Sequence, residues 1–513
     1  MRIVLTREIS TSLRRFPLSG CLCCVVCVAS AFAQGNRRDL EAGGAAIQAA
    51  TADPAIQGAL AQISTRQIRR TIERLVGFHN RNTLSSMDSG PGTERGVTAA
   101  ADWIAAELEQ YSADCGGCLE VKRDTFTEPP EPPPQGRIPQ PTKITNVYAI
   151  LHGRDPAQAS RMILVTGHYD SRNTDPMNTK AEAPGANDDA SGVAVSLECA
   201  RVLSRLKLPA TLVFAAVAGE EQGLNGSRHL AQLAKREGWK LEGVLNNDIV
   251  GGNTTPGDAS QDKSAVRVFS EGIPATATPD EIKRITALGL ESDSPSRELA
   301  RAVADVGRTY FAGSGARHLG STISHPGDLR SFHPVLVFRR DRYLRGGDHS
   351  SFNQEGFAAV RFTEWREDYN HQHQDVRTEN GVEYGDLLKF VDFDYVAGVA
   401  RLNAATLATL ASAPAPPRDV RMVTKDLDNA TNLHWKPSEG ASPGTRYEVV
   451  WRETFAPDWQ YSQLVPTPAN AERPEQGTLG AALSVSKDNV IFGVRAVDAA
   501  GHRSVAATPT PER

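Results

Sequence analysis

Acidic residues and histidines follow apolar runs at four places in the segment 163–252, and their types suit metal chemistry. In chain order these residues are His168, Asp170, Asp188, Asp189, Glu220, Glu221 and Asp248. Taken singly, an Asp in a Gly-rich turn is a common helix N-cap, and a Glu pair suits the positive end of a helix dipole. As a set from four element ends, joined by a later histidine, they match a carboxylate-rich site for two metal ions. Zinc accepts this mixture of imidazole and carboxylate ligands.

The two adjacent glutamates have a specific chemical use. A carboxylate committed to a metal cannot also accept a proton. A second, unbound carboxylate beside it can deprotonate a metal-bound water and later protonate a leaving amine. Glu220 and Glu221 can divide these two tasks between them.

The elements that must position these residues alternate between strands and helices. The strands we expect are 146–151, 161–165, 212–217, 243–245, 333–339 and 357–363. The helices we expect are 53–81, 94–111, 190–206, 299–306 and 387–411. This alternation predicts an α/β domain with a mixed, mostly parallel sheet flanked by helices. Since such sheets bind ligands at the carboxyl ends of their strands, we expect the polar residues to meet at that edge.

Beyond a Pro-rich linker at 413–417, the hydrophobic period changes to two. Short alternating strands at 432–435, 447–451 and 491–497 predict an all-β sandwich domain at 418–513. Its early Trp435 and central Tyr447, and its ending at 494–504, resemble a fibronectin type III module. That resemblance implies a binding or spacer role.

The first 33 of the 513 residues have the pattern of a signal peptide. A basic leader precedes a charge-free apolar run at 18–32, and Ala31 and Ala33 give a small-x-small cleavage site before Gln34. The apolar run is shorter than the roughly 20 residues that span a bilayer. We therefore expect a secreted or periplasmic protein with no stable membrane span after cleavage. A propeptide is a candidate for 34–54, and the net charge of −5 argues against a nucleic-acid partner.

Four of the seven cysteines lie in that leader. Cys115 and Cys118 allow a zinc half-site, a redox pair or a local disulfide. In an exported chain with no second Cys pair, we expect the disulfide. Cys199 lies in an apolar helical setting and is expected to be a buried thiol.

The segment 165–411 resembles metallopeptidase family twenty-eight, the co-catalytic two-zinc aminopeptidases. The resemblance is carried by the motifs at 168–170, 187–192, 220–223 and 247–248. It implies a zinc exopeptidase-like fold over 34–412, with its core at about 145–411, and two Zn²⁺ ions per chain.

The resemblance also implies roles for individual residues. Asp188 would bridge the two metals and be joined to Asp189 by a cis peptide. His168 and Asp248 would bind one ion, and Glu221 with a later His the other. Glu220 would be the general base and Asp170 would hold the His168 ring, so these two are the candidate catalytic residues. Asp348 and His349 resemble the family's substrate-pocket loop.

The later histidine departs from the family pattern. His371 has Asp375 four positions after it, the spacing typical of the family, whereas His373 stands where related chains often read Gln-His. We expect His373 to be the ligand and keep His371 as the alternative.

The implied function is a secreted exopeptidase that removes N-terminal amino acids from peptides or proteins, by attack of a hydroxide bridged between two zinc ions. Four alternatives stay open. The same scaffold could be a carboxypeptidase or a one-zinc glutaminyl cyclase. The chain could be a receptor-like binding ectodomain without catalysis, or the C-terminal sandwich could carry the main function. The preferred substrate side chain and the oligomeric state are not encoded in these motifs.

Overall fold

The computed structural model describes residues 44–88, 94–132, 136–255, 258–311, 332–465 and 477–512. The predicted signal peptide, with its four cysteines, lies outside these residues, as does most of the candidate propeptide. The residues from Gly43 to Arg513 form one compact unit.

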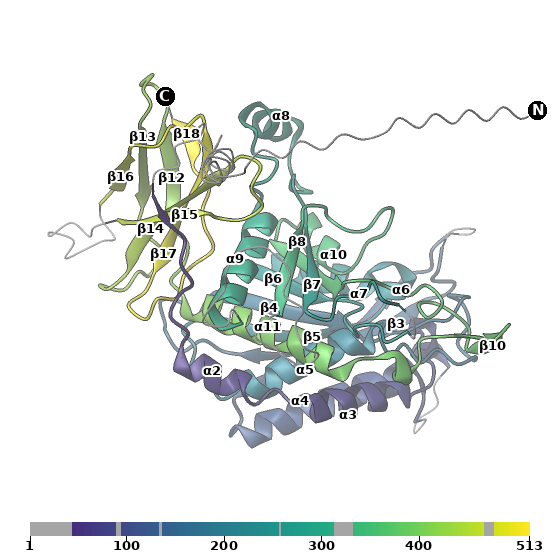
Figure 1. Cartoon of the computed structure of the whole chain (residues 1–513). Helices are drawn as coiled ribbons and strands as arrows, with labels where there is room; N and C mark the ends of the chain where they lie inside the picture. Colours follow the sequence, from purple (N-terminus) through teal and green to yellow (C-terminus); the bar gives the residue numbers. More distant parts are fainter. Residues whose placement is uncertain are drawn as a thin grey trace, which may run out of the picture. The chain divides into compact units, whose positions relative to one another are not determined.

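An eight-stranded mixed sheet, with helices on both faces, is the centre of this unit (Figure 1). The strands lie in the order β2-β3-β5-β4-β6-β9-β7-β8. Their bounds are β2 Leu119–Glu128, β3 Thr142–Leu151, β4 Arg161–His168, β5 Thr211–Val217, β6 Lys240–Asn247, β7 Ala265–Ser270, β8 His333–Val337 and β9 Ala359–Glu364. The four central strands β5, β4, β6 and β9 are parallel to one another, so their carboxyl ends share one edge. This confirms the predicted fold class.

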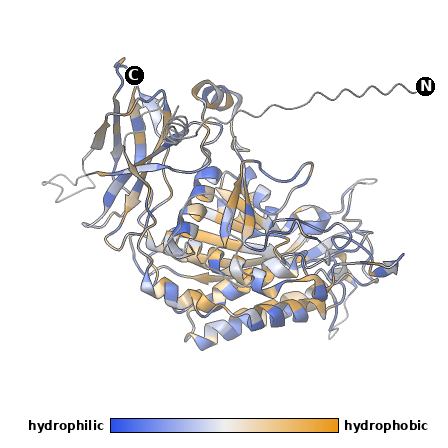
Figure 2. Ribbon diagram, viewed as in Figure 1, coloured by the Kyte–Doolittle hydropathy of each residue, from blue (hydrophilic) through white to orange (hydrophobic). Residues whose placement is uncertain are grey.

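The helices cover the two faces unequally. The larger layer contains α2 (Pro54–Leu60), α3 (Thr65–Val76), α4 (Gly96–Asp114), α5 (Ala190–Leu203), α9 (Pro295–Tyr310) and α11 (Phe393–Ser412). The opposite face is covered by α7 (Asn225–Arg236) and α10 (His349–Gln354). Apolar residues concentrate in the central strands and the helix faces turned toward them (Figure 2). In the described ranges, no helix has the length and apolar character needed to cross a membrane.

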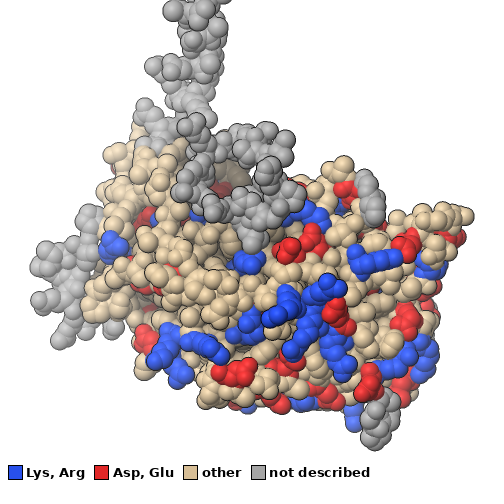
Figure 3. Space-filling model, turned by 60° about the horizontal axis from the view of Figure 1, so that its bottom comes forward, with Lys and Arg blue, Asp and Glu red and all other residues tan. Residues whose placement is uncertain are grey.

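The predicted single helix at 53–81 is instead two helices. The chain leaves α2 at Leu60 and starts α3 at Thr65, where the Ser64 hydroxyl accepts a hydrogen bond from the Gln67 N–H. An N-capping serine favours a new helix start over continuation. On the outer face that α3 and α4 form, basic and acidic side chains are interspersed (Figure 3), as expected from the small net charge.

The cysteines outside the leader are placed as predicted. Cys115 and Cys118 form a disulfide between the end of α4 and the start of β2. Cys199 is a buried free thiol in α5.

Two four-stranded sheets form the C-terminal part of the unit, in the orders β16-β13-β12-β18 and β1-β15-β14-β17. Their bounds are β12 Arg418–Val423, β13 Thr431–Lys436, β14 Arg446–Glu453, β15 Tyr461–Val465, β16 Leu479–Leu483, β17 Val490–Val497 and β18 Thr510–Glu512. The remaining strand, β1 (Ala45–Ala46), pairs with β15. The sequence analysis places residues 45–46 in the first domain, whereas the structure pairs them with a C-terminal sheet. A two-residue edge strand is too short to show a periodic pattern.

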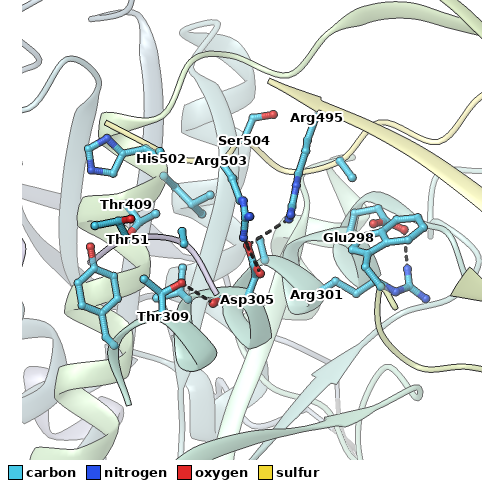
Figure 4. Close-up of a pocket in the computed structure, with 18 residues that line it drawn as sticks. Thr51, Glu298, Arg301, Asp305, Thr309, Thr409, Arg495, His502, Arg503 and Ser504 are labelled. Atoms are coloured by element: carbon cyan, nitrogen blue, oxygen red, sulfur yellow. Dashed lines mark hydrogen bonds and ion pairs between the residues drawn. The ribbon is translucent and has the colours of Figure 1, made fainter. Parts of the chain in front are cut away.

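Buried ion pairs join the C-terminal sheets to α9. Asp305 Oδ2 on α9 lies 3.1 Å from Arg495 Nη1 and 3.3 Å from Arg503 Nη1. Arg495 and Arg503 point toward Asp305 in a polar pocket between α9 and the sheets (Figure 4). Burial alone would raise the pKa of Asp305, but Arg495, Arg503 and Arg308 together lower it to about 2.

We predict that Asp305→Asn lowers the free energy of unfolding by about 2 kcal/mol at pH 7, because a carboxyl with a lowered folded-state pKa stabilises the protein once it is ionised. This contribution is complete above the ordinary Asp pKa of 3.8 and is lost as the pH falls toward 2. Urea unfolding of the wild type and the variant between pH 7 and pH 2.5 measures it. The control is Asp280→Asn, since Asp280 is 94% exposed and its ion pair with Lys283 is a weak surface pair. A difference that does not shrink at low pH would contradict the assignment.

Candidate functional site

The polar residues singled out in the sequence converge at the carboxyl edge of the central strands. His168 is the last residue of β4, and Asp248 directly follows β6. Glu220 and Glu221 begin the short helix α6 (Glu220–Gly223) just after β5. Asp188 lies in the turn before α5. The adjacent ends of parallel strands thus bring together residues that are up to 80 positions apart.

Two groups of side chains in this cluster have the spacing of metal ligands. His168, Asp188 and Asp248 form one group, and Asp188, Glu221 and His373 form the other. Within each group the potential ligand atoms lie within 4.8 Å of one another. His168 Nε2 is 3.1 Å from Asp188 Oδ1, whereas His373 Nε2 is 2.9 Å from Asp188 Oδ2. The two oxygens of one carboxylate therefore face the two groups.

The chemistry of this cluster fits a pair of divalent cations. His168 Nε2 and Glu221 Oε1 are buried beside other potential ligand atoms, at 3.1 Å from Asp188 Oδ1 and 3.0 Å from His373 Nε2. Among the described residues, neither atom makes a hydrogen bond of good geometry. Burial alone would lower the pKa of His373, but Glu221 and Asp188 together raise it to about 10. The same negative potential attracts a metal cation, and a bound cation would satisfy the buried ligand atoms.

Asp170 connects the histidine to the glutamate pair. Its carboxylate is fully buried and accepts hydrogen bonds from Thr83 Oγ1 at 2.9 Å and from the Glu221 N–H at 3.2 Å. It also accepts one from the Glu220 N–H at 3.3 Å. His168 Nδ1 lies 3.2 Å from the Asp170 carbonyl oxygen and 3.4 Å from its Oδ1. Asp170 thus positions the His168 ring and the start of α6 together.

The turn that carries Asp188 is held from both sides. The peptide bond between Asp188 and Asp189 is cis, as the resemblance implies. Asp189 turns away from Asp188 and accepts hydrogen bonds from the His168 N–H and the Gly192 N–H, at 3.0 and 2.9 Å. On the other side, Asp386 accepts from the Asp188 N–H at 2.7 Å. These contacts fix the backbone on which the shared carboxylate depends.

Several supporting residues were not predicted from the sequence. They are Asp386, Arg361, Gln372 and Glu364. Arg361 Nη2 lies 2.8 Å from Asp248 Oδ1, and Gln372 Nε2 donates to Asp188 Oδ2 at 3.0 Å. Arg361 has a detectable signal, since it is a charged residue in the middle of the apolar strand β9. Asp386 lies in a loop and belongs to no recognisable motif.

The two candidate histidines have different surroundings. His373 has a left-handed backbone conformation, with φ of 56°, and joins the second group, where its Nε2 is 3.0 Å from Glu221 Oε1. His371 points elsewhere, because its ring stacks on Phe390 with ring centres 3.7 Å apart. Ring stacking and the backbone turn therefore decide which imidazole reaches the cluster. The spacing of His371 to Asp375 does not bring His371 there.

Asp348 and His349 lie behind the site. Both side chains are fully buried, and neither is among the residues that line the open cavity over the cluster. Burial raises the pKa of Asp348 to about 7. The structure therefore gives these two residues no direct access to a substrate in that cavity.

The cavity over the cluster has a volume of about 490 Å³, and Glu220 lines it beside Glu221 and Asp248. Glu220 belongs to neither ligand group. Burial raises the pKa of its carboxyl well above the ordinary value, and Glu221 and Asp248 add to this against the effect of His168. Glu220 is thus a carboxylate that lies beside the two ligand groups and faces the cavity, where it can contact a bound ligand.

Comparison with known proteins identifies the family. Residues 146–292 match the model of Peptidase family M28. Over 474 residues the chain is 44% identical to a "Probable zinc metalloprotease" of Pyricularia oryzae, and the match covers 91% of this chain and 87% of that protein. The chain belongs to peptidase family M28.

The solved structures to which this chain is similar include two kinds of enzyme. The M28 chain is 19% identical to the LapA aminopeptidase of Legionella pneumophila, with 71% of this chain and 77% of that chain covered and a TM-score of 0.46. It is 18% identical to the Porphyromonas gingivalis glutaminyl cyclase, with coverage of 67% and 97% and a TM-score of 0.41.

We predict that His373→Ala lowers the content of bound divalent metal by about one ion per chain, because it removes the imidazole of the second group. His371→Ala is the matched control and retains the full metal content, since its ring packs on Phe390. Elemental analysis of both purified variants after dialysis measures this. A loss of metal in His371→Ala with none in His373→Ala would reverse the assignment.

Proposed function

We propose that this M28 peptidase is an aminopeptidase that uses two zinc ions. The observation that carries the proposal is that two ligand groups share Asp188. Glu220 belongs to neither group and lines the cavity beside them. His168 and Asp248 would complete one zinc site, and Glu221 and His373 the other. Imidazole and carboxylate are ligands that zinc accepts. The relatives named as probable zinc metalloproteases support the choice of metal.

When bound, the two zinc ions would polarise the scissile carbonyl and lower the pKa of a water molecule. Glu220 would accept the proton of that water and donate it to the departing amine. Burial raises the pKa of Glu220, and a carboxylate with a raised pKa is a stronger proton acceptor. Asp170 would keep the His168 ring oriented and hold the N–H groups of Glu220 and Glu221.

The choice of the N-terminus as the point of attack rests on the resemblance to the two-zinc aminopeptidases. The glutaminyl cyclase alternative works with one zinc, and here both groups have their full set of side chains. That favours two ions and hydrolysis. The binding-ectodomain alternative is disfavoured for the same reason, since such homologues usually lose ligands.

We further propose that the protein is exported and that its C-terminal sheets form a fibronectin type III-like module with a spacer or binding role. The Cys115–Cys118 disulfide supports export, because disulfides persist in oxidising compartments. The packing of two mainly antiparallel sheets around buried Trp435 and Trp451 supports the sandwich.

We predict that the mature protein begins at Gln34, because Ala31 and Ala33 provide the small residues that a signal peptidase requires. N-terminal sequencing of the protein recovered from the medium or the periplasm measures this. A mature chain that still begins at Met1 would contradict cleavage.

We predict that Glu220→Gln lowers kcat on aminoacyl-nitroanilides by about 10²–10⁴-fold, because general base catalysis contributes about that much. The variant keeps both zinc ions, since Glu220 is in neither ligand group. Steady-state kinetics and elemental analysis test both statements on one sample. Glu109→Gln, on the exposed side of α4, is the matched control. Near-normal turnover of Glu220→Gln would refute the role of Glu220, and loss of zinc would make it a ligand instead.

A further inference from the structure

Four arginines line the cavity over the cluster: Arg137, Arg172, Arg342 and Arg345. The same cavity is lined by four carboxylates: Asp188, Glu220, Glu221 and Asp248. Three of these carboxylates belong to the two ligand groups. Bound metal ions would occupy these three carboxylates, which would then offer the cavity arginines less negative charge.

Two of the arginines are already committed to the protein. Arg342 is nearly buried and pairs with Asp341 at 3.0 Å and with Glu367 at 2.6 Å. Arg137 donates to the Glu221 carbonyl oxygen at 2.8 Å. These two guanidinium groups have protein partners that hold them in place.

Arg172 is far less committed. Its Nε is buried and has no hydrogen-bond partner in the described part of the chain. Its nearest acidic atom is Glu221 Oε2, at 3.8 Å. If Glu221 binds a metal, that carboxylate has little charge left to offer Arg172. A buried donor without a partner costs free energy, which a ligand oxygen would recover.

Arg345 is the second arginine with incomplete pairing, and its side chain is more exposed than that of Arg172. Its side chain is 29% exposed, and it lies 3.3 Å from Glu367 and 3.1 Å from Gln372 Oε1. Glu367 is shared with Arg342 and Arg267, so it neutralises Arg345 only in part. Gln372 in turn donates to Asp188, so Arg345 is one side chain removed from the shared carboxylate.

We propose that Arg172 and Arg345 form a subsite for a carboxylate of the substrate, carried by the residue that follows the scissile bond. Guanidinium groups recognise carboxylates through paired, charge-assisted hydrogen bonds. Successive Cα atoms are about 3.8 Å apart, so a carboxylate on the next residue lies a few ångströms from the scissile carbonyl. Arg172 Nε lies 3.8 Å from Oε2 of Glu221, the proposed metal ligand, which is a similar distance. The inference rests on the proposed peptidase function and specifies its substrate class.

Two sources could supply this carboxylate. One is the C-terminal carboxylate of a dipeptide, and the other is an acidic side chain at the second position of a longer peptide. With either source, the enzyme would prefer substrates whose leaving group carries a negative charge. A cavity lined by apolar or neutral side chains would have no such preference.

The test compares Leu-Ala, Leu-Ala-amide, Leu-Glu-amide and Leu-Gln-amide as substrates of the full-length mature enzyme. We expect kcat/KM for Leu-Ala to exceed that for Leu-Ala-amide by about tenfold or more, since hydrogen bonds to charged groups give effects of that size. A preference for Leu-Glu-amide over Leu-Gln-amide would identify the side chain as a source as well. Equal kcat/KM for the acid and neutral member of both pairs would overturn the proposal.

Substitutions assign the effect to the arginines. Arg172→Gln and Arg345→Gln should bring the ratio of acid to neutral kcat/KM close to one. Arg366→Gln, an exposed arginine outside the cavity that pairs with Asp258, should leave the ratio unchanged. An unchanged ratio in both cavity variants would exclude Arg172 and Arg345 as the subsite.

Two further measurements separate this proposal from the proposed function. Calorimetric binding of Leu-Ala and Leu-Ala-amide to Glu220→Gln needs no turnover, and tighter binding of Leu-Ala supports the subsite even if no substrate is cleaved. Cleavage of N-acetyl-Leu-Ala but not of Leu-Ala-amide would retain the carboxylate subsite and replace the aminopeptidase by a carboxypeptidase. Equal binding of the acid and the amide would refute the subsite whatever the reaction.

Discussion

The site depends on one carboxylate whose two oxygens face different neighbours. Asp188 Oδ1 lies toward His168 and Oδ2 toward His373, so a small rotation of this side chain would separate the two ligand groups. The side chain can hold this orientation because its backbone is held. Asp386 accepts hydrogen bonds from the N–H groups of both Asn187 and Asp188, and Gln372 donates to Oδ2. The partners come from segments almost 200 residues later in the chain.

Concentrating acids at a buried edge is costly, and the surrounding arginines reduce that cost. An unpaired buried carboxylate would lose several kcal/mol of hydration. Asp248 is instead paired with the fully buried Arg361, which also lies 3.2 Å from Asp341. Burial alone would raise the pKa of Asp341, but Arg361, His349 and Arg342 lower it. The cluster is therefore embedded in a network of alternating charges that extends behind the cavity.

The sequence predicts the parts of this arrangement that have a local signal. The apolar runs that become β4, β5 and β6 each end in polar residues, and this pattern alone is enough to place His168, Glu221 and Asp248 at one edge of a sheet. The break between α2 and α3 is hidden because both helices have the same apolar period. Edge strand β1 and the role of Asp386 have no local signal, since each depends on a partner in a distant segment. Spacing likewise cannot choose between the two candidate histidines, because stacking on a separate segment decides it.

The C-terminal sheets are part of the same folded unit and not a tethered addition. Arg452 of β14 lies 2.5 Å from Asp293, just before α9, and Arg301 on α9 donates a hydrogen bond to the Pro457 carbonyl oxygen at 2.9 Å. These side chains are buried, so separating the sheets from α9 would leave charges without partners in a low-dielectric setting. Helix α9 packs on β7, β8 and β9, and β9 carries Arg361. The contact that secures the C-terminal sheets therefore lies on the helix that also supports the strand behind Asp248.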